Sequence, residues 1–173
     1  MVDEGSGAAV PSQELTDDVV RRALRNCSKG EASRLNVPAW VGETDTARSP
    51  VVGWRDPKAP ERGVLLVLGG GQVRGLVLRA PSGGARAAAM CDLCRTTRSA
   101  GDVALFAAPR AGAAGRRGDT VGVYACADLA CARCVEVVKG TPALRPDPGR
   151  SVEERRADLA RRAGAFVDSV LGV

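Results

Sequence analysis

The 173-residue sequence contains no histidine and few aromatic residues, and both absences narrow its chemistry. Without histidine the chain lacks the commonest general base and a common zinc ligand. Few aromatic side chains leave little surface on which nucleic-acid bases could stack. The sequence also lacks an apolar run approaching the roughly 18 residues that suggest a membrane span, so no membrane partner is expected.

The N-terminus lacks the features of a secretory signal. MVDEGSGAAVPSQ carries acidic residues where a signal peptide would carry basic ones, which predicts a cytoplasmic protein. Residues 1–12 are expected to form a disordered leader. Basic residues outnumber acidic ones by 25 − 20 = 5 over the whole chain. Residues 86–135 contribute 7 − 4 = 3 of that excess, which favours an acidic protein or nucleic acid as partner.

Cysteines are concentrated in one stretch: five of the six lie between Cys91 and Cys134. Clustered thiols, beginning here with the C-x2-C motif CDLC, are typical of a structural zinc site. Spacing alone leaves two choices for the second ligand pair, Cys126 with Cys131 or Cys131 with Cys134. The expected helix favours the pair Cys126 and Cys131, because a helix capped by Asp128 would place Cys134 on a buried face with Val137 and Val138. A disulfide pair or reduced core thiols are the less favoured alternative.

The order of predicted elements around the cysteines is that of a treble-clef finger. Short strands are expected near residues 103–106 and 121–124, joined by a Gly-rich basic turn over 109–119, and a helix follows near Asp128. Three arginines of the turn have no local partner except Asp119 and are expected to reach outward: Arg110, Arg116 and Arg117.

This stretch resembles the treble-clef zinc-finger domain of elongation factor G-binding proteins, the FBP domain, a group that includes fusidic-acid-resistance proteins. Residues 26–38 and 53–60 also resemble segments of single-domain members, so the resemblance covers most of residues 13–171. It implies one structural Zn²⁺ held by Cys91, Cys94, Cys126 and Cys131. The family pattern matches at Cys91, Cys94, Tyr124, Cys126, Asp128, Leu129 and Cys131.

The rest of the chain predicts an α+β fold, a small antiparallel sheet with flanking helices and a treble-clef four-cysteine zinc finger. Helices are expected over 15–27, after the capping residue Ser28, and from Ser151. Strands are expected over 51–54, 63–68 and 72–78, the last two joined by a glycine turn that is a hairpin rather than a phosphate loop. Trp40, Trp54 and Cys27 are expected in the core, and Arg155, Arg156, Arg161 and Arg162 on a solvated basic face.

The expected organisation is one FBP-type domain over residues 13–171. It comprises a helical and hairpin part over 13–80, a linker at 81–86, the zinc finger over 86–138 and a C-terminal helix over 151–171.

A zinc ion closed by four thiolates has no open position for water, so neither enzymatic activity nor a small-molecule substrate is expected. The resemblance implies binding to elongation factor G and release of that factor from the ribosome. The alternative is binding of rRNA or other nucleic acid through the basic hairpin. Partner contacts are expected on the knuckle and hairpin of the finger, from Arg95, Arg98, Phe106, Arg110, Arg116, Arg117 and Tyr124.

Overall fold

A computed structural model describes residues 12–80 and 90–173 of the chain. The expected leader, apart from Ser12, and the expected linker at 81–86 lie outside the described residues. The described helices are α1 Asp17–Ala23, α2 Lys29–Arg34, α3 Ala39–Gly42, α4 Gly112–Arg116, α5 Cys131–Val135 and α6 Val152–Leu171. The described strands are β1 Val51–Asp56, β2 Ala59–Gly69, β3 Gln72–Arg79, β4 Thr97–Arg98, β5 Val103–Pro109, β6 Thr120–Cys126 and β7 Leu144–Arg145.

Five of the strands form one antiparallel sheet in the order β1-β2-β3-β5-β6. The predicted hairpin between β2 and β3 is confirmed, and Gly70 and Gly71 make its turn with φ of 59° and 74°, a conformation that glycine adopts without strain. The finger hairpin β5–β6 continues the same sheet through the pairing of Arg79 with Ala107. Strands β4 and β7 form a separate two-stranded ribbon.

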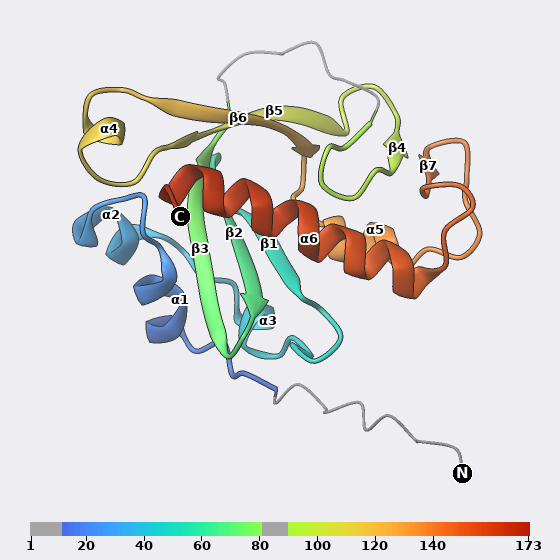
Figure 1. Cartoon of the computed structure of the whole chain (residues 1–173), viewed down its shortest axis with the longest axis horizontal. Coiled ribbons are helices and arrows are strands. Elements are labelled where there is room, and N and C mark those ends of the chain that lie inside the picture. The colour runs from blue at the N-terminus through green and yellow to red at the C-terminus, as the bar shows by residue number, and fades with distance from the viewer. Residues whose placement is uncertain (1–11, 81–89) are drawn as a thin grey trace.

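Helices cover both faces of the sheet, and this explains the unbroken apolar run in β2 (Figure 1). Leu65 and Val67 belong to the core cluster that contains residues of α6, whereas Val64 and Leu66 belong to the cluster formed with α1, α2 and α3. Because successive strand side chains point to opposite faces, a strand buried on both sides is apolar at every position. The α+β prediction is therefore confirmed, with the finger hairpin built into the sheet.

The predicted helix starts are confirmed by their capping contacts. Ser28 Oγ accepts a hydrogen bond from the Glu31 amide, and Ser151 and Glu154 form a complete capping box at the start of α6. Helix α1 is shorter than predicted, because the chain is extended at Leu24 and bridges to Gly75 of β3. None of the helices within the described ranges has both the length and the apolar composition needed to cross a membrane.

The two tryptophans differ in burial, and the prediction that both are core anchors is wrong for Trp40. Trp54 is 4% exposed, and its indole N–H donates to the Asn36 carbonyl at 3.1 Å. Trp40 is 48% exposed and meets Trp54 edge-on, with ring centroids 6.3 Å apart. The short helix α3 therefore contributes Val41, which is fully buried, to the core and leaves Trp40 at the surface.

Asn26 ties the N-terminal helices to the finger hairpin. Its side-chain amide donates to the Val77 carbonyl at 2.9 Å and the Pro109 carbonyl at 3.0 Å, and its Oδ1 accepts from the Val77 amide at 2.8 Å. The residue is 8% exposed, so these backbone groups have little access to water as replacement partners.

Replacing Asn26 with leucine should lower the free energy of unfolding by about 1–3 kcal/mol, since buried backbone groups would lose their partners. Urea denaturation of the zinc-loaded protein measures this change. Substitution of the exposed residue Lys29 by methionine in the neighbouring helix is the control and should have little effect. An unchanged midpoint for Asn26→Leu would contradict the prediction.

Candidate metal centre

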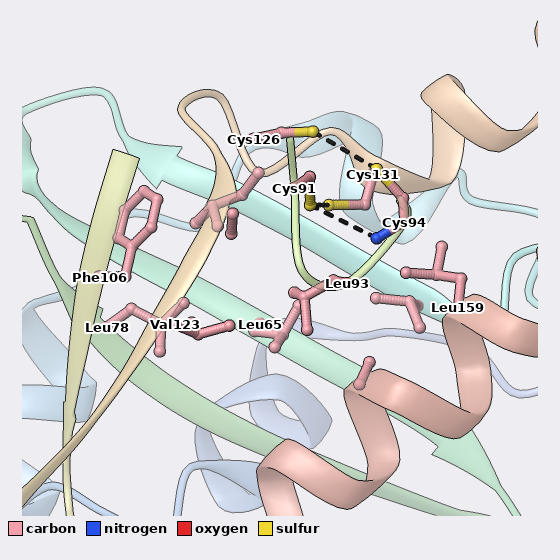
Figure 2. Close-up of a cluster of buried hydrophobic side chains, with 14 of the residues drawn as sticks. Leu65, Leu78, Cys91, Leu93, Cys94, Phe106, Val123, Cys126, Cys131 and Leu159 are labelled. Carbon is pink, nitrogen blue, oxygen red and sulfur yellow. Dashed lines mark hydrogen bonds between the residues drawn. The ribbon is translucent and has the colours of Figure 1, made fainter. Parts of the chain in front are cut away.

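Four cysteine sulfurs meet in a buried cluster beside the main core. The Sγ atoms of Cys91, Cys94, Cys126 and Cys131 all lie within 4.8 Å of one another. Cys91 and Cys131 are 3.7 Å apart, and Cys94 and Cys126 are 3.6 Å apart. Each residue is at most 1% exposed. Figure 2 shows the sulfurs together at the edge of the apolar cluster that includes Leu65, Phe106 and Leu159.

These distances fit a tetrahedral zinc ion. Sulfurs about 2.3 Å from a common Zn²⁺ in tetrahedral arrangement are separated by about 3.8 Å. A disulfide requires sulfurs about 2.05 Å apart, and all six cysteines are free in this structure. Four thiolates satisfy the ion completely, so it serves as a cross-link between the knuckle, the end of β6 and the start of α5.

The knuckle that carries Cys91 and Cys94 is held on the edge of β6. The Asp92 amide donates to the Tyr124 carbonyl at 2.8 Å, and Asp92 Oδ2 accepts from the Tyr124 amide at 3.1 Å. The turn closes at Arg95, which has a φ of 57° and donates its amide to the Cys91 carbonyl at 3.0 Å. A left-handed conformation is unusual for arginine, and the surrounding structure must enforce it.

The second ligand pair brackets a tight turn rather than a capped helix start. Asp128 Oδ1 accepts from the Ala130 amide at 3.0 Å, and α5 begins only at Cys131. The prediction that Asp128 is the N-cap is therefore wrong, because its side chain bonds within the turn two residues along. Cys131 is consequently the first residue of α5 rather than the third.

Leu129, between the two ligands, seats this turn on the sheet. Its φ is 56° and its side chain is 1% exposed. The turn approaches β1 and β2 at two glycines: a Cβ on Gly53 would lie 2.6 Å from the Leu129 carbonyl oxygen, and one on Gly63 would lie 2.5 Å from Leu129 Cδ1. Both glycines thus supply the space that the metal-binding turn occupies.

Helix α6 also holds the finger in place through hydrogen bonds from its arginines. Arg155 Nη1 donates to the Val137 carbonyl just after α5 at 2.8 Å, and Arg162 Nη1 donates to the Leu93 carbonyl in the knuckle at 3.3 Å. Arg155 is only 6% exposed. These arginines therefore stabilise the finger from within the molecule.

The predicted solvated basic face of α6 is accordingly wrong for Arg155, Arg156 and Arg162, whereas Arg161 is exposed as predicted. Its remaining arginines are also paired within the chain: Arg156 contacts Glu136 at 2.7 Å, and Arg161 contacts Asp158 at 3.2 Å. The hydrogen bond from Arg156 lowers the pKa of Glu136. The sequence pattern could not distinguish the Arg156 pair from a solvated charge, because its partner Glu136 lies outside the helix.

The two other cysteines have separate environments. Cys134 is 3% exposed, its sulfur is 3.9 Å from Cys126 Sγ, and it accepts a hydrogen bond from Arg98 Nη1 at 3.2 Å. The expected burial with Val138 is wrong, since that side chain is 86% exposed. Cys27 packs partly buried against the second core cluster, where burial and then Glu31 raise its pKa to about 11.

The predicted partner-contact residues divide into buried and exposed groups. Phe106 is fully buried, so its prediction as a contact residue is wrong. Arg98, whose side chain is 13% exposed, supports the finger through Cys134 and through Asp128 at 3.7 Å. The exposed members are Arg95, Arg116, Arg117 and Tyr124.

The basic turn is ordered, which corrects the expectation that Arg110 reaches outward. Residues 112–116 form α4, Arg110 Nη1 donates to the Ser169 carbonyl at 2.5 Å, and the Ala111 amide donates to the Val170 carbonyl at 3.1 Å. These contacts fix the turn against the C-terminal end of α6.

One exposed apolar residue of the finger, Leu105, is not among the contact residues predicted from the sequence. Leu105 is 37% exposed and pairs across the strands with Tyr124, which is 38% exposed. The alternation of side chains along β5 could have revealed it, since Leu105 and Phe106 must face opposite sides.

The knuckle, hairpin, helix and four-thiolate site together define a treble-clef zinc-finger protein. A family model described as FBP C-terminal treble-clef zinc-finger matches residues 19–170, and the chain belongs to this family. Among solved structures, the chain is similar to that described as "Structure of the fusidic acid resistance protein FusC", with 17% identity and a TM-score of 0.45. The match covers 70% of this chain and 54% of the other, so this chain spans about half of that protein. No curated protein matches.

Proposed function

We propose that the protein binds translation elongation factor G through its zinc finger and promotes release of that factor from the ribosome. Membership of the FBP family supports this proposal, because the sequence resembles the zinc-finger domain of elongation factor G-binding proteins. The proposed partner would place the protein in the cytoplasm.

We also propose that the protein acts by binding rather than by catalysis. The four sulfurs are buried and would complete the coordination of a zinc ion, which leaves no position at which the metal could activate water. The zinc is then a structural element that shapes a docking surface.

The observation that carries the proposal is an exposed apolar pair on the outer face of the finger hairpin. Leu105 and Tyr124 lie side by side across β5 and β6, on the face opposite Phe106 and the main core. Arg95 is exposed on the adjoining knuckle, where the Asp92 carboxylate accepts a hydrogen bond from the Tyr124 amide. An apolar and aromatic centre with an arginine beside it is typical of protein interfaces.

The alternative partner, rRNA or other nucleic acid, would depend on the arginines of the finger. Arg98 is held by contacts within the chain, which reduces the positive surface next to the knuckle. Arg116 and Arg117 lie at the opposite end of the hairpin from the metal-binding turn (Figure 1). A protein partner therefore suits the knuckle end better.

Removing Tyr124 and Arg95 together should weaken binding to elongation factor G by roughly tenfold or more, the range of interface residues that carry most of the affinity. The double variant is Tyr124→Ala with Arg95→Gly, because glycine removes the arginine side chain without a penalty at a φ of 57°. Isothermal calorimetry with purified elongation factor G measures the affinity. The same variant should also fail to accelerate dissociation of ribosome-bound elongation factor G.

The matched control removes an exposed aromatic residue and an exposed arginine from another region, as Trp40→Ala with Arg48→Gly. It should bind with the wild-type affinity, and both double variants should retain zinc. If wild type and both double variants bind with equal affinity, the contact with elongation factor G does not include Arg95 and Tyr124. If wild-type protein does not bind elongation factor G, the proposed function is wrong.

A further inference from the structure

The basic turn of the finger and the N-terminal helices line an open, polar pocket. Its volume is about 520 Å³, within the range of pockets that hold small molecules. Residues from three distant segments line it, among them Arg25, Ser28, Arg79, Arg110 and Arg116. Figure 1 shows α4 beside α2 and the C-terminal end of α6, remote from α5 and its metal-binding turn.

The pocket is strongly positive. Four arginines and one acidic residue, Glu31, are among its lining residues, a net charge of 4 − 1 = +3. Glu31 is already paired with Arg79 at 3.2 Å. Within residues 12–80 and 90–173, neither Arg25 nor Arg116 forms an ion pair. Like charges held close together repel one another, and a bound anion would relieve that repulsion.

The fold fixes this convergence of arginines. Asn26, next to Arg25, is bonded to the Val77 and Pro109 carbonyls, so it joins the α1–α2 connection to β3 and to the start of the basic turn. Arg110 is held by the Ser169 carbonyl, which leaves its guanidinium positive. The fold therefore fixes the segments that carry these arginines, and the side chains of Arg25, Arg79 and Arg116 are exposed at the pocket.

The lining also indicates the class of ligand. Guanidinium groups donate paired hydrogen bonds that match phosphate oxygens, and the Ser28 hydroxyl can donate one more. No aromatic side chain of the described residues lines the pocket, so nothing there would stack on a nucleobase. Recognition must then rest on the charge of the ligand and its oxygen atoms.

We propose that this pocket binds a ligand carrying neighbouring phosphate groups, through Arg25, Arg79, Arg110 and Arg116. The site is separate from the outer face of the finger proposed to contact elongation factor G. A protein that binds at both places could respond to a phosphate-rich ligand while docked.

Tripolyphosphate is the first probe, measured by calorimetry on the zinc-loaded protein. Wild type should bind it, more tightly than inorganic phosphate, and the affinity should fall as salt is raised. The variant Arg25→Gln with Arg116→Gln should bind at least about tenfold more weakly, since charged hydrogen bonds are lost. Its matched control is Arg22→Gln with Arg117→Gln, which makes the same charge change within a few residues of each tested position but outside the pocket lining.

A short single-stranded RNA distinguishes the sources of the phosphates. RNA binding tighter than tripolyphosphate, lost in the first variant and kept in the control, would support the site and assign it to a nucleic-acid backbone. Binding of tripolyphosphate alone, with the same dependence on the two arginines, would support a small phosphate-rich ligand. Failure of wild type to bind either probe at millimolar concentration, or equal losses in both variants, would overturn the proposal.

Discussion

Replacing Cys126 with serine should release the zinc and unfold the finger, whereas replacing Cys134 with serine should do neither. Structural zinc contributes on the order of 10 kcal/mol of apparent folding free energy in small modules, comparable with the whole stability of a typical domain. Cys126 is one of the four mutually close sulfurs. Cys134 lies outside that group, where its sulfur contacts Cys126 Sγ and accepts a hydrogen bond from Arg98. Metal analysis of both purified variants measures zinc per chain.

Hydrogen exchange after chelation should show how far the unfolding extends. The finger strands share their core with the rest of the molecule, since Phe106 and Val123 pack in the same cluster as Leu65 and Leu159 (Figure 2). We therefore expect protection to be lost over 91–131 and weakened in α6. Strands β1, β2 and β3, which also pack on α1 and α2, should keep their protection.

Two outcomes would contradict this prediction. If Cys134→Ser loses the metal and Cys126→Ser keeps it, the ligand set is wrong. If verified metal-free protein retains full exchange protection over 91–131, the zinc does not stabilise the finger.

The parts of the fold that local chemistry controls could be predicted from the sequence. Ser28 and Ser151 cap helices because a hydroxyl placed before a helix satisfies free amides, whatever the distant chain does. The C-x2-C motif likewise brings Cys91 and Cys94 to one side of a turn by local geometry alone. The residues alone favoured Cys126 over Cys134 but left both choices open, because both lie near Cys131, and the family resemblance strengthened the choice.

Features that depend on distant packing could not be predicted in this way. Leu105 and Phe106 are adjacent apolar residues in one strand; alternation places them on opposite faces, but which face is buried depends on the distant segments that pack against the sheet. Arg155 is buried because the Val137 carbonyl, 18 residues away in the chain, accepts its hydrogen bond. The prediction that Arg110 reaches outward is wrong for the same reason, since the C-terminal end of α6 holds its guanidinium, whereas Arg116 and Arg117 are exposed as predicted.

Adding a methyl group at Gly53 should destabilise the protein and weaken its hold on zinc. A Cβ there would lie 2.6 Å from the Leu129 carbonyl oxygen and 3.1 Å from Leu129 Cβ, so the backbone between Cys126 and Cys131 must move. Overpacking of this kind costs about 1–3 kcal/mol. Leu129→Ala should cost about 2–5 kcal/mol, because it empties a buried site. Urea unfolding measures stability, and competition with a chelator measures zinc affinity.

A pair of double variants separates contact with the Leu129 side chain from contact with its backbone. At Gly63 the added methyl would meet Leu129 Cδ1 at 2.5 Å, so Leu129→Ala should relieve the clash and make Gly63→Ala with Leu129→Ala less costly than the sum of its parts. At Gly53 the nearest atom is a backbone oxygen that Leu129→Ala retains, so the two costs should add. Gly69→Ala, with no atom within 4 Å of the new methyl, is the control and should leave zinc affinity unchanged. If Gly53→Ala binds zinc as tightly as the Gly69 control, the sheet does not position the metal-binding turn.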